Sequence, residues 1–442
     1  MLLSLTLALA LAGCAGRPES GARQPPPGFS ADTFTREGLI SGATATEAGC
    51  RALPDGLWVT IGSRHECLRY AAGETERRQA RTALVHFPGD PPGVSYRFAG
   101  GRAHVDQVSD FYEHTPGSRR IAAEALAGAM HDLPVFLMGR IGMHGSSGNH
   151  AKDRHTQDAV LLVDAALDEL KRRHGFRDFA LSGFSSGGQL VANLLARRND
   201  IRCAVIASAP LDLALYYQRQ DGITSDYFAM HRSELADPMR TVQSIRSDAT
   251  VFVIGDDRDR SVPHAAWDAW EAAARLRGLR VFDAEVAGSD RPEFGGGATH
   301  HITGVRSLEA AYACGVGTPG EEVRRALVAS EPVLKPRGRR LEGEEIKAAF
   351  AGRRLAGVVW PHWGTRVTSL ILWGADGKRS EFHPAHPERP VGVVQRWWVE
   401  GNRLCTTEDG CNAVLVDGRF LHVVKGEPPR LLMTFAAAPP GG

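Results

Sequence analysis

Two adjacent serines, Ser185 and Ser186, lie in the stretch ALSGFSSGGQL. The pattern Gly-x-Ser-x-Gly fits only around Ser185, because Gly183 and Gly187 stand two positions before and after it. For Ser186 the same offsets fall on a phenylalanine and a glycine, so the pattern breaks. In this motif the serine occupies a sharp turn from strand to helix, with its hydroxyl exposed as a nucleophile. The spacing therefore predicts nucleophilic attack by Ser185, with the backbone N–H of Ser186 as one donor to an oxyanion.

The residues around this turn support that interpretation over two other glycine-rich loops. A phosphate-binding loop needs Gly-Lys-Ser/Thr, and no lysine follows here. A dinucleotide-binding loop needs a glycine where Ser185 stands. The apolar run RDFALSG before the turn predicts a strand, and GQLVANLLARR after it predicts a helix. This is the context that a nucleophile turn requires.

A nucleophilic serine needs a base, and the base needs a carboxylate to orient it. In the strand-to-helix version the order along the chain is serine, acid, histidine. An acidic loop follows the apolar run TVFVIG, and a later glycine-rich loop carries two adjacent histidines that cannot both reach one serine. The candidate acids are Asp256, Asp257 and Asp259, and the candidate bases are His300 and His301.

A second oxyanion donor is expected from the loop after the strand RTALVHF. That loop reads PGDPPG, so the backbone N–H of Gly89 or of Asp90 could supply it. The glycine also fits an ordinary turn.

Strands alternate with helices on both sides of these residues, which predicts an α/β fold with a mainly parallel sheet covered on both faces. Residues 55–70 add an expected antiparallel pair. One long helix is expected between Thr156, which can cap its start, and Gly175, which can end it. The expected strands are Ala83–Phe87, Val135–Met138, Phe179–Ser182, Cys203–Ala207, Thr250–Ile254 and Val281–Val286.

The region from about Arg81 to Gly315 resembles bacterial envelope α/β-hydrolases related to the prolyl oligopeptidase-like serine hydrolases. The resemblance rests on the motifs above together with GRIGMHGSSGNH, DIRCAV and ADPMRTVQSIRSD. It implies an α/β-hydrolase fold. It also implies that Asp259, four residues before Pro263, is the acid, with Asp257 as second choice.

The same resemblance assigns the base. In these hydrolases the histidine precedes a small residue and an apolar helix start, so His300 is the expected base and His301 the second choice. In the GRIGMHGSSGNH loop, Arg140 could hold a substrate carboxylate or pair with an acidic loop residue. His144 and His150 are expected to be structural or to line the rim of the site.

The pattern changes near Ala329–Arg340. Beyond it, after the short helix EEIKAAF, β-rich runs are separated by the turn signals ADG, EGN, EDG and VDG. We expect a signal peptide at 1–14, a flexible tether at 15–40, the hydrolase domain at 41–328 and a small antiparallel β-domain at 340–435. Of the adjacent Trp397 and Trp398, one should be core and the other surface, because neighbours on a strand face opposite sides.

The N-terminal run MLLSLTLALALAGCAG is apolar and short, and Leu11–Cys14 resembles the lipobox of bacterial lipoproteins. That resemblance implies lipidation at Cys14, and we expect a membrane-anchored protein of the bacterial cell envelope. The other six cysteines form an even set, as in an exported protein. The expected disulfides are Cys50–Cys67, Cys203–Cys314 and Cys405–Cys411.

The formal net charge is +1 and no basic run occurs, so we expect no nucleic-acid partner. We also expect no cofactor and no metal, since the two adjacent histidines lack a regularly spaced third ligand. The predicted function is a serine hydrolase acting on a small ester or a short peptide-like substrate. The alternative is a non-catalytic envelope lipoprotein that uses the hydrolase fold as a scaffold and the β-domain for binding.

Overall fold

The computed structural model describes residues 34–73, 80–219, 225–262, 264–288, 300–362 and 368–436. Cys14, the signal peptide and most of the expected tether lie outside these residues. The tether was expected to extend to residue 40, but the chain from Phe34 onward is folded. Phe34 and Leu39 are buried, and α1 spans Arg36–Ser41. Within the residues that the structure describes, no helix is both long and apolar enough to cross a lipid bilayer.

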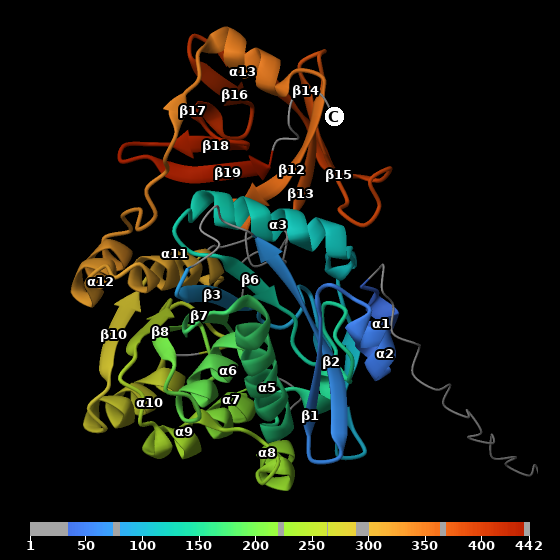
Figure 1. Ribbon diagram of the computed structural model, residues 1–442, viewed down its shortest axis with the longest axis vertical. Helices are drawn as coiled ribbons and strands as arrows, with labels where there is room; N and C mark the ends of the chain where they lie inside the picture. The colour runs from blue at the N-terminus through green and yellow to red at the C-terminus, as the bar shows by residue number, and fades with distance from the viewer. Residues whose placement is uncertain are drawn as a thin grey trace, which may run out of the picture.

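A mainly parallel sheet forms the centre of the larger lobe (Figure 1). Its strand order is β1-β2-β6-β3-β7-β8-β9-β10. The pairs β1–β2 and β2–β6 are antiparallel, and the other neighbours run parallel. The strands are β1 (Gly56–Ile61), β2 (Arg64–Gly73), β3 (Thr82–Phe87), β6 (Val135–Met138), β7 (Asp178–Phe184), β8 (Ile201–Ala207), β9 (Thr250–Gly255) and β10 (Arg280–Glu285). All six expected central strands and the antiparallel pair are confirmed, and with them the α/β-hydrolase fold.

Helices cover both faces of this sheet because successive strand residues point to opposite sides. Val85 and Phe179 pack into the core on one face, and their neighbours Leu84 and Ala180 pack into the core on the other. The first face carries α5 (Gln157–His174), α6 (Ser186–Leu195) and α10 (Ala265–Leu276), and the second carries α3 (Pro116–Ala129), α11 (Gly304–Gly315) and α12 (Gly320–Val328).

The expected caps of the long helix α5 are confirmed. The Thr156 hydroxyl accepts the backbone N–H of Ala159 at 3.2 Å, and Gly175 adopts the left-handed conformation with φ of 76°. The short helices are α2 (Glu47–Arg51), α4 (His150–Asp153), α7 (Leu213–Arg219), α8 (Ser225–His231), α9 (Pro238–Thr241), η1 (Asp110–Tyr112), η2 (Val242–Ser244) and η4 (Trp360–His362).

A hairpin between β3 and α3 was not expected from the sequence. It consists of β4 (Ser95–Ala99) and β5 (Arg102–Gln107). Its residues are mostly exposed or half-buried, so they form no apolar run that would signal a strand. The ring of Phe98 packs against Tyr227 of α8 with a centroid distance of 4.8 Å. The hairpin and α8 therefore meet, although they come from different crossovers of the sheet.

The C-terminal domain is an antiparallel barrel. Its strands follow the order β17-β16-β15-β14-β13-β12-β19-β18, and pairing of β17 with β18 closes the ring. The chain enters it through β11 (Arg339–Arg340) and α13 (Gly343–Phe350). The ring strands are β12 (Arg353–Val359), β13 (Ser369–Trp373), β14 (Lys378–Phe382), β15 (Pro390–Glu400), β16 (Arg403–Thr406), β17 (Gly410–Asp417), β18 (Phe420–Lys425) and β19 (Arg430–Ala436).

The barrel has a core of its own, in which Phe350, Trp373 and Phe435 pack edge to face. The expectation for the paired tryptophans is confirmed, since Trp397 is 7% exposed and Trp398 is 42% exposed. The short helix and the four turns expected in this region also occur in the structure.

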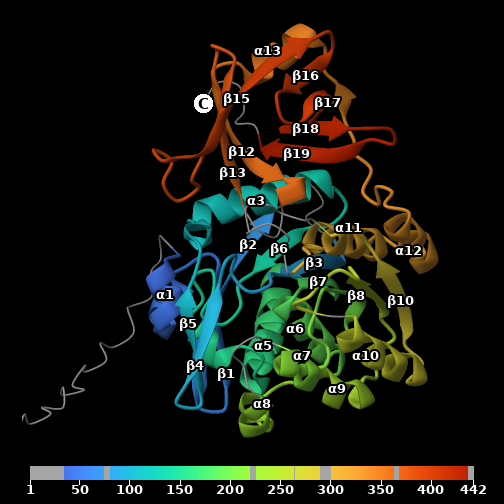
Figure 2. The same ribbon diagram turned by 180° about the vertical axis from the view of Figure 1, so that it is seen from behind.

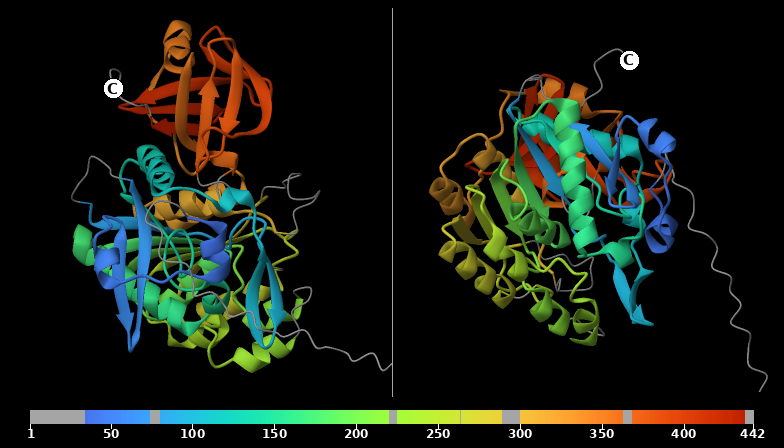
Figure 3. Two further views of the ribbon diagram at one scale, coloured as in Figure 1. Left: turned by 90° about the vertical axis from the view of Figure 1, so that its right-hand side faces the viewer. Right: turned by 60° about the horizontal axis from the view of Figure 1, so that its bottom comes forward.

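The barrel rests on helix α3 of the hydrolase domain. Figures 1 and 2 show it from opposite sides above α3, and Figure 3 shows it from the side as a distinct lobe. Val358 and Trp360 of the barrel pack into the core around α3. The Thr368 hydroxyl donates to the backbone oxygen of Ser118 at 2.6 Å. Shared apolar packing and polar contacts therefore join the two domains.

All three expected disulfides are present, as Cys50–Cys67, Cys203–Cys314 and Cys405–Cys411. The second joins β8 to α11 on the second face of the sheet. The first ties α2 to β2, and the third closes the β16–β17 hairpin.

Candidate active site

Ser185 occupies a strained turn between β7 and α6. Its φ is 53° and its ψ is −124°, a combination that non-glycine residues rarely adopt. Such a conformation costs about 1–3 kcal/mol and persists only where the surrounding structure enforces it. The N–H of Ser185 donates to the oxygen of Ala207 on β8 at 2.8 Å, which helps to fix the turn. This is the backbone geometry of a nucleophile turn.

The glycines around Ser185 allow elements to approach closely. A Cβ on Gly183 would lie 2.3 Å from the oxygen of Gly187, so strand and helix could not pack as they do. A Cβ on Gly187 would lie 2.2 Å from the oxygen of Phe87 at the end of β3. A Cβ on Gly89 would lie 3.0 Å from Cβ of Ser185. The loop after β3 is thus packed directly against the serine turn.

His300 and Asp259 form a hydrogen-bonded pair. Nδ1 of His300 lies 2.7 Å from Oδ2 of Asp259, whose side chain is buried. The other carboxylate oxygen accepts the backbone N–H groups of Ser261 and Val262 at 2.9 Å and 3.0 Å, so the acid is held from both sides. With the Nδ1 proton directed at Asp259, the neutral ring carries its lone pair on Nε2.

The ring of His300 lies beside the serine turn. It stacks on Phe184, the residue before the serine, with a centroid distance of 5.2 Å. Nε2 of His300 is buried and has no hydrogen-bond partner within the described residues. An imidazole arranged in this way can accept a proton from a neighbouring hydroxyl.

The second-choice residues lie in other environments. Asp257 is exposed. His301 is buried, with Nδ1 2.7 Å from Oδ2 of Asp256. Asp256 also accepts the N–H of Gly288 at 2.6 Å and pairs with Arg258 at 2.7 Å. The two neighbouring histidines therefore turn to two different carboxylates instead of toward one common site.

Ser186 is the first residue of α6, so its N–H has no partner within the helix. Its hydroxyl is bonded to a side chain other than His300. Oγ lies 2.9 Å from Nε2 of His155, and Nδ1 of that ring lies 2.9 Å from the Tyr217 hydroxyl. His155 is fully buried, and burial is the largest of the effects that hold its pKa well below the usual value. This chain of side chains anchors the start of α6.

Asp90 lies in a buried cluster of charges that the sequence did not reveal. Arg140 reaches Asp90 Oδ1 at 2.8 Å, and Arg154 reaches Oδ2 at 2.5 Å. Arg140 also donates to the oxygen of Gly89 at 2.8 Å. Burial would raise the pKa of Asp90, but Arg154 and Arg140 outweigh it and hold that pKa well below its ordinary range. The loop after β3 is thus fixed by its own carboxylate.

In this structure Arg140 therefore pairs with an acidic loop residue, Asp90. The adjoining cavity is about 20 Å³, with space for about one water, and it is lined by residues that include Arg140, Arg154 and Ser186. It is too small for a substrate. His144 and His150 are buried among aromatic and polar neighbours, where His150 bonds the Tyr96 hydroxyl at 2.7 Å.

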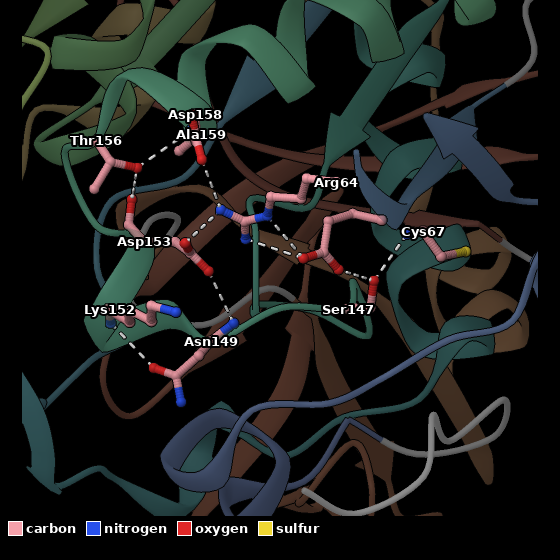
Figure 4. Close-up of polar contacts among 10 residues, drawn as sticks. Arg64, Cys67, Ser147, Asn149, Lys152, Asp153, Thr156, Asp158 and Ala159 are labelled. Atoms are coloured by element: carbon pink, nitrogen blue, oxygen red, sulfur yellow. Dashed lines mark hydrogen bonds and ion pairs between the residues drawn. The ribbon is translucent and has the colours of Figure 1, made fainter. Parts of the chain in front are cut away.

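The glycine-rich loop after β6 is held by β2 (Figure 4). The Ser147 hydroxyl accepts the N–H of Cys67 at 2.8 Å, and Arg64 pairs with Asp153 at 2.8 Å. Asp153 in turn accepts the N–H of Asn149 at 3.1 Å. The sequence singled out this loop by resemblance, and the structure shows that it positions Arg140 and the residues that follow it.

No family model matches the sequence, and no curated protein matches it either. Similar solved structures include an acylaminoacyl peptidase from Pyrococcus horikoshii, 12% identical with a TM-score of 0.37. That match covers 52% of this chain and 36% of the peptidase, so it spans little more than a third of that protein. Est1E from Butyrivibrio proteoclasticus is 11% identical with a TM-score of 0.37, and the match covers 60% of this chain and 98% of Est1E. A lipase/esterase from Lactobacillus plantarum is 13% identical with a TM-score of 0.35, and the match covers 52% of this chain and 90% of that one.

Proposed function

We propose that this protein is a serine hydrolase that cleaves an acyl ester or amide through an acyl-enzyme. The observation that carries the proposal is the pairing of a strained serine turn with an oriented histidine. Ser185 has φ of 53°, and His300 beside it donates to Asp259 at 2.7 Å while its Nε2 is unbonded among the described residues. Strain and an open base nitrogen both cost stability, and catalysis is the use that explains both.

In the proposed reaction, Oγ of Ser185 attacks the acyl carbon while Nε2 of His300 takes the hydroxyl proton. Asp259 holds the ring orientation and stabilises the imidazolium. The imidazolium then protonates the leaving alcohol or amine as the acyl–oxygen or acyl–nitrogen bond breaks. Water, deprotonated by His300, attacks the acyl-enzyme, and the proton returns to Ser185 as the acid is released.

The oxyanion donors in this proposal are the N–H of Ser186 and an N–H of Gly89 or Asp90. Two observations support the second donor. Gly89 packs against Ser185, and the Asp90 carboxylate is held by Arg140 and Arg154. A donor that is fixed before the reaction stabilises the developing charge without reorganisation.

The substrate class we propose is a small ester or a short peptide-like amide. The hairpin β4–β5 meets α8 through Phe98 and Tyr227, and His231 of α8 lies 2.6 Å from the oxygen of Gly101 in the hairpin turn. We infer that two insertions that contact each other in this way narrow the space available to a substrate. Such narrowing favours small or extended substrates over bulky ones.

The function can be tested with a panel of acyl esters and aminoacyl amides. We expect turnover of at least one class, and a loss of roughly 10⁴–10⁶-fold in Ser185→Ala. The matched control is Ser186→Ala, which removes only the hydroxyl bonded to His155 and should keep activity within roughly 10-fold. A large loss in Ser186→Ala with activity kept in Ser185→Ala would overturn the assignment. No turnover across the panel would favour the scaffold alternative.

We further propose that the protein is anchored to the bacterial envelope through Cys14. Six of the seven cysteines form three disulfides, which leaves Cys14 as the odd one. Disulfides persist in oxidising compartments outside the cytosol. Cys14→Ser should move the protein from the membrane fraction to the soluble fraction of a bacterial host, and continued membrane retention would contradict the anchor.

A further inference from the structure

Two histidines and a carboxylate meet where the barrel rests on helix α3. His131 follows α3, Asp417 ends β17 and His422 lies on β18. One potential ligand atom of each lies within 4.8 Å of the other two. The cluster shares no residue with the proposed catalytic machinery. His131 is far in sequence from Asp417 and His422, which belong to one hairpin, and the three meet only because the two domains pack.

His422 is the residue of this cluster whose second ring nitrogen has no structural role in the fold. Its side chain is 1% exposed, and Nδ1 lies 3.1 Å from the Thr434 hydroxyl. Nε2 is buried and has no hydrogen-bond partner in the part of the chain that the structure describes. A buried polar atom without a hydrogen-bond partner destabilises the fold, so a ligand at Nε2 would relieve that cost.

The other two residues form the outer side of the cluster. Nε2 of His131 lies 2.9 Å from Oδ2 of Asp417, and their side chains are 24% and 33% exposed. An ion could therefore enter from solvent, and water could complete its coordination. The cation of the same hairpin, Arg419, lies 3.2 Å from Glu124 and is already paired. The C-terminal end of α3 adds partial negative charge, which favours a cation here.

We propose that His131, Asp417 and His422 bind a divalent transition-metal ion of the zinc class, with water as the remaining ligand. Imidazole nitrogen and carboxylate oxygen are both common zinc ligands, at about 2.0–2.2 Å from the ion. Ligand atoms around a tetrahedral zinc are then about 3.3 Å apart. In the structure, Nε2 of His131 and Oδ2 of Asp417 are 2.9 Å apart, and the ligand atoms of all three residues lie within 4.8 Å of one another. These separations bracket the value for zinc, so small side-chain rotations would bring the three atoms into position around an ion.

Neighbouring side chains can hold the ligand His422 in a fixed orientation, as a metal site requires. Metal-binding histidines usually donate their other ring N–H to a fixed acceptor. In the tautomer that leaves Nε2 free for an ion, Nδ1–H of His422 donates to the Thr434 hydroxyl, which also accepts the indole N–H of Trp360 at 2.9 Å. The ring orientation is therefore set before an ion arrives.

A metal ion at this position would join the two domains. It would link the segment that follows α3 to the β17–β18 hairpin. The same surfaces are already in tight contact: a Cβ on Gly128 of α3 would lie 2.6 Å from the ring of Phe420. Because a ligand that binds only the folded chain stabilises it, the ion should raise the Tm of the full-length protein.

The test is a titration of chelator-treated full-length protein with Co²⁺, followed by visible absorption and then by displacement with Zn²⁺. The wild type should bind one equivalent, and its Tm should rise with Zn²⁺ and fall again with a chelator. His131→Ala and Asp417→Asn each remove one partly exposed ligand and should weaken binding by at least about 100-fold. His422→Ala should do the same.

Arg419→Gln is the matched control. It removes an interdomain ion pair on the same hairpin without removing a ligand, so it should keep one equivalent of Co²⁺. A cooperative thermal unfolding transition confirms that a variant is folded. The proposal is overturned if the wild type binds no more Co²⁺ than His131→Ala, or if Asp417→Asn and His131→Ala both bind as tightly as the wild type.

Discussion

Two histidine–carboxylate pairs lie side by side in this protein, and they are alike in distance but not in environment. His300 and His301 are consecutive, and each lies 2.7 Å from its own aspartate. The His300 side chain is 26% exposed and stacks on the residue before the proposed nucleophile, whereas the His301 side chain is 6% exposed. A short distance to a carboxylate therefore does not identify which histidine acts as the base. The histidine whose ring lies beside the proposed nucleophile is the better candidate.

The environment of His301 indicates a positioning residue. Its acid, Asp256, also pairs with Arg258 and accepts the N–H of Gly288, so three segments converge on one carboxylate. The backbone oxygen of His301 accepts the Ser208 hydroxyl at 3.1 Å. These contacts hold the chain just after His300, which fixes where the His300 ring can lie.

Replacing each histidine in turn by asparagine should give the largest difference between the two pairs. In His300→Asn the side-chain amide can still donate to Asp259, but no Nε2 is left to take a proton. We expect kcat/KM to fall by roughly 10⁴–10⁶-fold with Tm nearly unchanged. In His301→Asn the amide can still donate to Asp256, so activity should stay within roughly 10-fold. Ester hydrolysis and thermal unfolding measure both, and equal losses in the two variants would refute the distinction.

A smaller effect is expected on the acid stability of the protein when Asp256 is replaced. Burial acts to raise the pKa of Asp256, but Arg258, His301 and the N–H of Gly288 outweigh it and lower that pKa. A carboxylate with a lowered folded-state pKa stabilises the fold above its unfolded pKa of about 3.9, and this contribution is lost as the pH falls through the folded-state value. The free energy of unfolding should therefore fall less between about pH 6 and about pH 3 in Asp256→Asn than in the wild type. Denaturant titrations at both pH values measure this. Identical pH slopes would show that Asp256 is not stabilised by these partners.

Local patterns explain why much of the fold could be predicted. The central strands are continuous apolar runs because both faces are buried, and α5 carries its caps in the sequence at Thr156 and Gly175. The serine turn was recognisable because close packing of strand and helix demands glycines at fixed offsets around Ser185. The disulfides Cys50–Cys67 and Cys405–Cys411 join cysteines close in the sequence, and an even cysteine count left Cys203 and Cys314 as the remaining pair.

Long-range packing explains what could not be predicted. The sequence allowed an acidic loop residue as the partner of Arg140 but could not identify it as Asp90. Asp90 lies before α3 in the sequence and both Arg140 and Arg154 lie after it, and no spacing rule connects them. The contact of Ser186 with His155 is equally non-local. The β4–β5 hairpin lacks an apolar run because it lies at the surface. The start of the folded region was placed too late because a single buried Phe34 carries little signal.

The central claim is that Ser185 is the nucleophile activated by His300, and covalent labelling tests it most directly. The wild type should take up one equivalent of a fluorophosphonate probe, measured by intact mass, and peptide mapping should place the label on Ser185. Ser185→Ala and His300→Asn should label far more slowly, while Ser186→Ala and His301→Asn should label nearly as fast as the wild type. A label mapped to Ser186, or no label on the folded wild-type protein, would contradict the account.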